Sequence, residues 1–90
     1  MQDQDLNKLY LHSINHKAEI QTSKVCGCFY CKRIFEPQNV KEWLKDREWT
    51  ALCPFCGIDA VIGDASGYSI NNDVLDKMNK KFFNKNVYTI

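Results

Sequence analysis

Apolar side chains recur at helical spacing near the start of the chain. Leu6, Leu9 and Tyr10 form a short stripe, and their spacing predicts a helix over residues 3–21. The stripe weakens after Ile14. This segment is therefore predicted to be either one helix or a helix followed by an irregular connector.

A second helical stripe near the end of the chain predicts a helix over residues 73–84. Its members are Leu75, Met78 and Phe82. Asn71 or Asn72 precedes this stripe, and an asparagine side chain there can accept a hydrogen bond from a backbone amide of the first turn. We expect one of the two to cap the helix.

Between the stripes the pattern is shorter and favours strands. Residues 25–35 are predicted to form a strand that enters a cysteine turn and leaves it again, and residues 49–52 a second strand. The apolar run at 58–62 predicts either a third strand or a single helical turn. Two glycines in residues 63–67 predict a turn there.

The segment between the first two strands is predicted to be helical over residues 37–46. Pro37 suits the first position of a helix, and Trp43 and Leu44 lie at helical spacing from Val40. Trp43 and Leu44, together with Trp49, are expected to cover the neighbouring strands as part of the core.

Length, net charge and cysteine content limit the possible classes of protein. Ninety residues make one domain with a small core, and a net charge of +1 gives no global basic field that would attract a nucleic acid or a membrane. No apolar run is long enough to span a bilayer, and residues 1–20 lack a signal-peptide core. Five cysteines without an export signal predict a reducing compartment, and hence a cytoplasmic protein.

Four of the cysteines form two Cys-x-x-Cys pairs, and residues 32–52 separate them. The pairs are Cys28 with Cys31 and Cys53 with Cys56. This spacing is typical of a structural Zn²⁺ site, in which four thiolates surround the metal as a tetrahedron and leave no position open for substrate. Binding of zinc to such a site contributes roughly 10–16 kcal/mol in small peptides, which would stabilise so short a chain. Gly57 directly follows the second pair and suits the positive φ of a metal turn. Lys32 in the equivalent place should either strain the first turn slightly or relax its geometry.

The fifth cysteine and one of the pairs allow other interpretations. Cys26 is either a small apolar residue beside the site or a reactive thiol next to the metal. The run from Cys53 to Cys56 also resembles a glutaredoxin-type redox motif, which needs its first cysteine at the N terminus of a helix in a βαβ scaffold. Only 34 residues follow Cys56, so the sequence does not favour that scaffold.

Several polar residues outside the pairs are weaker candidates. His12, His16 and Glu19 lie at helical spacing, which allows a second metal site, an acid–base pair or, as we favour, a solvated surface. His16 could alternatively donate a hydrogen bond to a metal-bound thiolate. Asp59 and Asp64 are candidates for a nuclease-like site, but turn and capping roles are favoured.

Basic residues gather at the first cysteine pair and in the last helix, which allows a nucleic-acid interface. They are Lys32, Arg33, Lys77, Lys80, Lys81 and Lys85. The alternative without a binding role is that these lysines keep an amphipathic helix soluble, and that nearby aspartates partly neutralise their charge.

The string CGCFYCKRIFEP followed by ALCPFCGIDAVIGD resembles a family of small bacterial and phage cytoplasmic proteins. The resemblance covers most of the chain. It implies a zinc-ribbon or rubredoxin-like core and one structural metal, and it implies no particular activity.

Together these observations predict a small α+β zinc ribbon in a single domain, residues 1–90. A short antiparallel sheet with the two cysteine turns, at about 25–62, would lie between N- and C-terminal helices. We expect a non-enzymatic, zinc-stabilised module that binds a protein partner, with Phe29, Tyr30 and Tyr68 as anchors. A nucleic-acid-binding zinc ribbon ranks second and a metal-dependent hydrolase third. No membrane association or small-molecule substrate is predicted.

Overall fold

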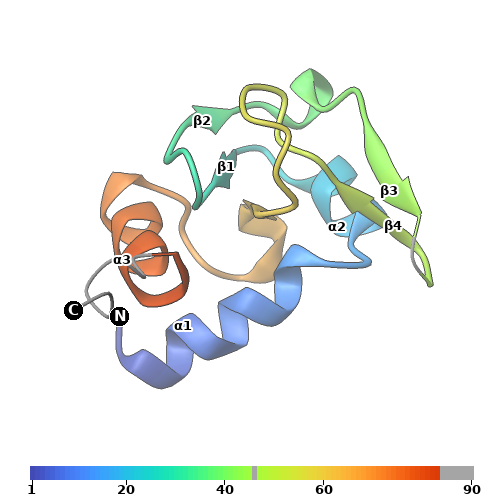
Figure 1. Ribbon diagram of the computed structural model, residues 1–90. Coiled ribbons are helices and arrows are strands. Elements are labelled where there is room, and N and C mark those ends of the chain that lie inside the picture. The colour runs from blue at the N-terminus through green and yellow to red at the C-terminus, as the bar shows by residue number, and fades with distance from the viewer. Residues whose placement is uncertain (46, 84–90) are drawn as a thin grey trace.

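The computed structural model describes residues 1–45 and 47–83, and it has the small α+β architecture that the sequence predicts (Figure 1). The helices are α1 (Asp3–Tyr10), α2 (Lys17–Thr22) and α3 (Asn72–Phe82), with short 3₁₀ helices at Leu11–Ser13, Pro37–Asn39 and Asp64–Ser66. The strands are β1 (Cys26–Cys28), β2 (Ile34–Phe35), β3 (Trp43–Lys45), β4 (Trp49–Ala51) and β5 (Val61–Gly63). Within these described residues, no helix has both the length and the apolar character needed to cross a membrane.

The strands form two small antiparallel sheets. In the three-stranded sheet β1 is central, with β2 on one side and β5 on the other. Strands β3 and β4 form a separate hairpin in which Leu44 lies opposite Thr50. The hairpin extends from the body of the molecule beside α2 (Figure 1).

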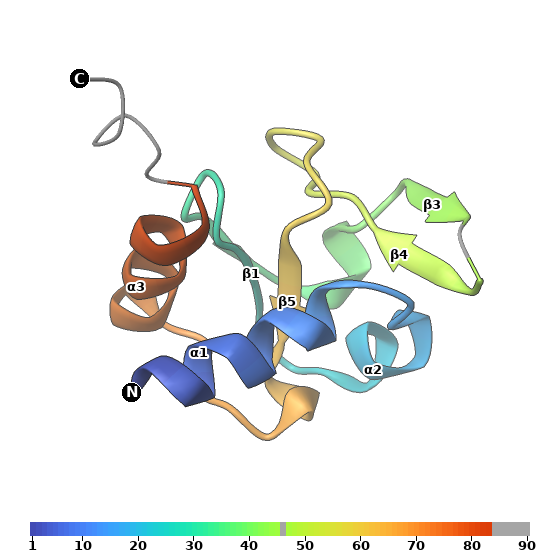
Figure 2. The ribbon, with the colours of Figure 1, turned by 60° about the horizontal axis from the view of Figure 1, so that its bottom comes forward.

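Helices α2 and α3 cover opposite faces of the three-stranded sheet, and α1 runs across β5 (Figure 2). Gly27 marks the face that meets α3, because a Cβ atom there would lie 2.8 Å from a methyl carbon of Leu75. Gly63 marks the other face, where a Cβ atom would collide with Ser23 just after α2. Both glycines therefore let a helix or its flanking residue approach the strands closely.

A single apolar core joins the helices to the sheet. Leu9, Ile20, Ile62, Leu75 and Met78 are fully buried in it. An aromatic stack between Tyr10 and Phe82, with ring centroids 4.2 Å apart, joins α1 to α3. The two ends of the fold are thus packed on each other as well as on the strands.

The N-terminal segment is not one continuous helix. It breaks after the 3₁₀ turn at Leu11–Ser13 and resumes as α2. Asn15 lies in the break with φ at +49°, a left-handed conformation that asparagine tolerates better than most residues. Its side-chain oxygen accepts a hydrogen bond from the Glu48 amide at 2.9 Å, so a distant segment fixes the break.

The predicted helix over residues 37–46 is wrong. Among the described residues 37–45, only Pro37–Asn39 is helical, as one 3₁₀ turn, and Trp43–Lys45 is a strand. The expected burial is also wrong in part, because Leu44 and Trp49 are exposed and Trp43 is only partly buried. Substitution of Trp43 should therefore cost less than that of a fully buried tryptophan.

The C-terminal helix is confirmed with its cap. Asn71 is the capping residue, and its side chain accepts a hydrogen bond from the Val74 amide at 2.9 Å. The described helix ends at Phe82, and the last predicted residue, 84, lies outside the described residues. The turn predicted over residues 63–67 is also confirmed, with Gly67 at a φ of +95°.

Candidate metal centre

The first cysteine turn follows β1 and closes on its own backbone. The Cys28 amide donates to the carbonyl of Arg33 at 3.0 Å, and the Lys32 amide donates to the carbonyl of Cys28 at 2.7 Å. Lys32 takes a positive φ of 65° to complete the turn. The predicted strain at this lysine is therefore present, because a side chain with a Cβ disfavours that conformation.

The second turn has the same two backbone hydrogen bonds as the first. The Cys53 amide donates to the carbonyl of Ile58 at 3.0 Å, and the Gly57 amide donates to the carbonyl of Cys53 at 2.9 Å. Gly57 has a φ of 78°, as predicted, and glycine adopts it without cost. Two unrelated stretches of sequence thus fold into the same turn, with one cysteine at each end.

The two turns bring four sulfur atoms together, from Cys28, Cys31, Cys53 and Cys56. All four lie within 4.8 Å of one another, and two distances between the turns are 3.6 Å (Cys28 to Cys56) and 3.7 Å (Cys31 to Cys53). A tetrahedron with metal–sulfur bonds of about 2.3 Å has sulfur atoms about 3.8 Å apart. The cluster therefore matches the size of a four-thiolate metal site.

Backbone amides point at the cysteine sulfurs. The Tyr30 amide lies 3.4 Å from the Cys28 sulfur, and the Phe55 amide lies 3.4 Å from the Cys53 sulfur. Such donors favour a thiolate over a thiol. They are placed identically in the two turns, as expected for sites that hold negative charge.

Burial works against ionisation in the same cluster. It raises the pKa of the Cys28 and Cys56 thiols. At Cys53 burial also acts to raise the pKa, but hydrogen bonds from the Cys56 and Phe55 amides and from the Cys31 and Cys56 thiols together outweigh it and lower the pKa. A divalent cation would supply the charge that stabilises four thiolates so close together. The residues present thus fit a soft metal ion with an all-sulfur ligand set.

Cys26 lies outside the cluster. It is fully buried on β1, where its register partners are Phe35 and Gly63. Burial, with a smaller contribution from the Asp64 charge, raises the pKa of this thiol to about 12. Cys26 is thus a buried apolar residue and lacks the exposed, readily ionised thiol of a reactive cysteine.

The redox interpretation of the second pair finds no scaffold in the structure. Cys53 follows β4 and starts a turn, whereas a low-pKa redox cysteine starts a helix. Cys53 and Cys56 each contact a sulfur atom of the first turn, at 3.7 Å (Cys31) and 3.6 Å (Cys28). The geometry therefore favours shared coordination over pairing within the turn.

Helix α3 supports the first turn through a residue that the sequence did not single out. The side-chain amide of Asn79 donates to the carbonyls of Phe29 and Tyr30, both at 3.0 Å. The residues around Asn79 in the sequence do not indicate this role, because its hydrogen-bond partners lie about 50 positions earlier in the chain. Phe29 is almost fully buried beneath the same helix, so the prediction of Phe29 as an exposed anchor is wrong.

The three-residue set of His12, His16 and Glu19 does not form the solvated helix face that we favoured. His12 contacts Glu19 at 2.9 Å and is partly exposed, but His16 is buried. The Nε2 atom of His16 accepts a hydrogen bond from the Ala51 amide at 3.0 Å, and its Nδ1 atom faces the carbonyl of His12. His16 therefore binds the hairpin. The alternative prediction, that His16 donates a hydrogen bond to a metal-bound thiolate, is also wrong.

This buried histidine should make the hairpin sensitive to acid. Burial lowers the pKa of His16 from its ordinary value of 6.5, so the unfolded chain takes up a proton more readily than the folded one. The contribution of neutral His16 to the free energy of unfolding is therefore fully present above pH 6.5, and it is lost as the pH falls below that value. We expect the free energy of unfolding to fall between about pH 7 and pH 5.5, and to fall less in His16→Gln.

Urea unfolding at a series of pH values measures this slope. His12→Gln is the matched control, because it removes an imidazole that does not bond the hairpin. Equal pH slopes for wild type and His16→Gln would show that His16 is not responsible.

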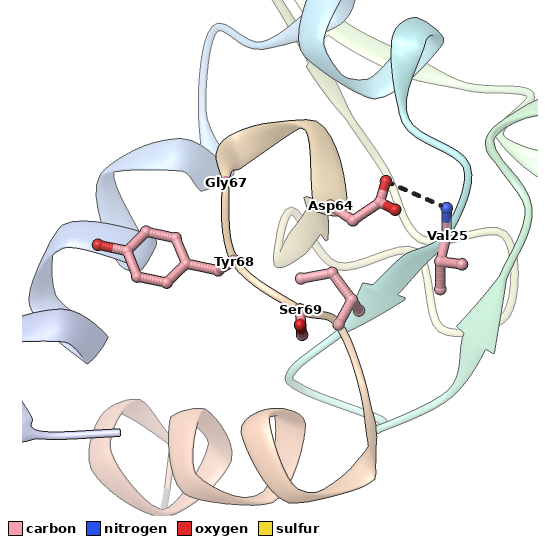
Figure 3. A pocket seen from close by; sticks show the side chains of 6 residues that line it. Val25, Asp64, Gly67, Tyr68 and Ser69 are labelled. Carbon is pink, nitrogen blue, oxygen red and sulfur yellow. Dashed lines mark hydrogen bonds between the residues drawn. The ribbon is translucent and has the colours of Figure 1, made fainter.

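Of the two carboxylates behind the second turn, Asp64 has a structural role. Asp64 accepts hydrogen bonds from the Lys24 and Val25 amides at 2.8 and 3.3 Å, and the Lys24 amide lowers the pKa of this group. Asp64 and Tyr68 line an open pocket of about 410 Å³, but the Tyr68 ring is directed away from the carboxylate (Figure 3). Asp59 lies exposed in a bend. The favoured turn role for Asp64 agrees with these contacts.

Most of the lysines proposed for a nucleic-acid interface are paired with carboxylates. The pairs are Lys32 with Asp76, Lys77 with Asp73, Lys80 with Asp76 and Lys81 with Asp3, at 2.7–3.3 Å. Arg33 instead lies over the exposed Phe55 ring, 4.8 Å from its centroid. Lys85 lies outside the described residues.

Comparisons with family models, with curated proteins and with solved structures find no match for this chain. The resemblance to small bacterial and phage cytoplasmic proteins therefore stays a prediction.

Proposed function

We propose that this chain is a zinc-stabilised, non-enzymatic module of the cytoplasm that binds a protein partner. The observation that carries the proposal is the four-sulfur cluster of Cys28, Cys31, Cys53 and Cys56. Four protein thiolates would fill a tetrahedral site and leave the metal no open position for a substrate or an activated water. The metal would then hold two loops together without taking part in chemistry.

Zinc is the ion that best suits this cluster. It binds thiolates at about 2.3 Å, takes tetrahedral geometry and has no redox chemistry of its own. The matched backbone turns hold all four sulfur atoms near those positions with little further adjustment. In the cytoplasm, reduced cysteines would remain available to the metal.

Two observations support a protein partner over a nucleic acid. Four of the candidate lysines already neutralise carboxylates, so the face proposed for phosphate groups, at α3 and the first cysteine turn, has little free positive charge. Tyr30 and Phe55, near the tips of the two turns, are about half exposed, and aromatic side chains of this kind are enriched in protein interfaces.

Fluorescence anisotropy with single- and double-stranded DNA and RNA tests this ranking. We expect dissociation constants no tighter than roughly micromolar at physiological salt, because the net charge is only +1 and the lysines of α3 already pair with carboxylates. Charge reversal of Lys77, Lys80 and Lys81 should change this weak binding little. Capture from nuclease-treated lysate should then recover a protein that binds the purified chain directly.

Sub-micromolar binding that falls steeply with salt and disappears in the charge-reversed variant would reverse the ranking. It would make the chain a nucleic-acid-binding zinc ribbon, the second candidate.

A further inference from the structure

The hairpin has one strand edge whose backbone groups have no partner among the described residues. The Leu52 amide donates to the carbonyl of Glu42 at 3.0 Å, which places positions 42 and 52 in a hydrogen-bonded pair. Hydrogen-bonded and non-hydrogen-bonded pairs alternate along an antiparallel ladder, so Leu44 and Thr50 form the next hydrogen-bonded pair. The backbone N–H and C=O groups of Trp43 and Lys45 therefore point away from β4. Together these two residues offer two N–H donors and two C=O acceptors along the free edge of β3.

The other edge of the hairpin is occupied. The His16 amide donates to the carbonyl of Trp49 at 3.0 Å, and the Ala51 amide donates to His16 Nε2. Asn15 adds a third bond, from its amide to the Thr50 hydroxyl at 2.8 Å. Strand β4 is thus held on both sides, whereas β3 lies at the margin of the molecule in both views (Figures 1 and 2).

Cations gather on one face beside this open edge. The ammonium group of Lys17 lies 5.6 Å from the ring centroid of Trp43 and 5.7 Å from that of Trp49. The ammonium group of Lys45 lies 5.0 Å from the centroid of Trp49. Among residues 1–45 and 47–83, neither lysine forms an ion pair, in contrast to the lysines of α3.

A pocket of about 350 Å³ opens where β3 begins. Trp43, Val40 and Pro37 supply its apolar wall, and Gln21 and Gln38 complete the lining. It is large enough for one branched or aromatic side chain. An extended chain paired with β3 would place alternate side chains on this face, about two residues apart in sequence.

We propose that the free edge of β3 binds an extended segment of the partner protein as a third strand of the hairpin. The segment would place an apolar side chain in the pocket beside Trp43 and a carboxylate, two positions along, near Lys45 and Lys17. Backbone hydrogen bonds to Trp43 and Lys45 would supply affinity, and the pocket and the lysines would supply specificity. This inference rests on the proposed function, because it takes the partner to be a protein.

Charge favours an acidic segment over a second copy of this chain. A second β3 strand at the same edge would bring a second Lys45 and a second Lys17 to a face that already carries these two cations, neither of which pairs with a carboxylate of the described residues. An acidic segment would neutralise the same face, and complementary charge also favours correct register and orientation.

A library of displayed random twelve-residue peptides, selected on the full metal-loaded chain, tests the proposal. We expect the selected peptides to share an apolar residue followed two positions later by Asp or Glu. Lys45→Pro removes the outward amide but leaves the hairpin bonds of Leu44 intact, and proline is tolerated on edge strands. Lys45→Ala is the matched control, because it removes the same charge and keeps the amide.

Lys45→Pro should weaken binding of the selected peptide about tenfold more than Lys45→Ala, the upper range for the loss of one backbone bond. In the wild-type chain, the peptide should slow hydrogen exchange at the amides of Trp43 and Lys45. The exchange measurement remains decisive if the proline variant fails to fold.

Three results would overturn the inference. Equal binding to the two Lys45 variants, with exchange slowed instead at Tyr30 and Phe55, would move the site to the cysteine turns and leave the proposed function standing. A dimer in sedimentation that Lys45→Pro abolishes would show that a second copy occupies the edge. Selection of no peptide, together with tight nucleic-acid binding, would remove the proposed function as well.

Discussion

Removal of the metal should unfold the chain. Structural zinc contributes roughly 10–16 kcal/mol in small sites, whereas the net stability of a small domain is only about 5–15 kcal/mol. Excess chelator should therefore abolish the dispersed amide signals of an NMR spectrum, and added Zn²⁺ should restore them. Cys53→Ser should have the same effect without chelator, because Cys53 belongs to the cluster and its sulfur accepts amide hydrogen bonds.

Cys26→Ala is the matched control for Cys53→Ser. It removes a fully buried thiol on β1, and that thiol lies outside the cluster. We expect this variant to keep its metal and to lose only a modest part of its stability. Loss of metal from Cys26→Ala would show that the ligand set is wrong.

Leu75→Ala should strongly destabilise the fold while leaving the metal site intact. Leu75 is fully buried on α3, and its methyl groups pack directly on Gly27 of the central strand. Truncation would leave a cavity between helix and sheet, at a cost of about 2–5 kcal/mol. Urea unfolding of the metal-loaded protein measures the loss as a lower transition midpoint.

Leu11→Ala provides the comparison, because Leu11 is 70% exposed. We expect a change within about 0.5 kcal/mol for this variant. Similar losses for Leu11→Ala and Leu75→Ala would contradict the packing of α3 on the sheet.

The cysteine turns could be predicted from sequence because every signal for them is local. The spacing of Cys28, Cys31, Cys53 and Cys56 predicts the four-sulfur cluster that the structure shows, and Gly57 predicts the backbone conformation of the second turn. The cap at Asn71 is predictable for the same reason, since its partner amide lies three residues away. Residues within a few positions in the sequence determine the conformation of the cysteine turns and of the helix cap.

The hairpin could not be predicted because distant contacts decide it. Val40, Trp43 and Leu44 fit a helix as well as a strand over so short a run. The choice depends on Asn15 and His16, whose hydrogen bonds reach Glu48, Thr50 and Ala51 some 33–35 positions later. The same bonds interrupt the N-terminal helix, so the break that the sequence left open and the wrong helix at 37–46 have one physical cause.

X-ray absorption spectroscopy of the purified protein, with metal analysis of the same sample, tests the central claim most directly. The account predicts about one zinc per chain with four sulfur ligands at about 2.3 Å. A folded protein without metal that contains a disulfide between Cys53 and Cys56 would contradict it.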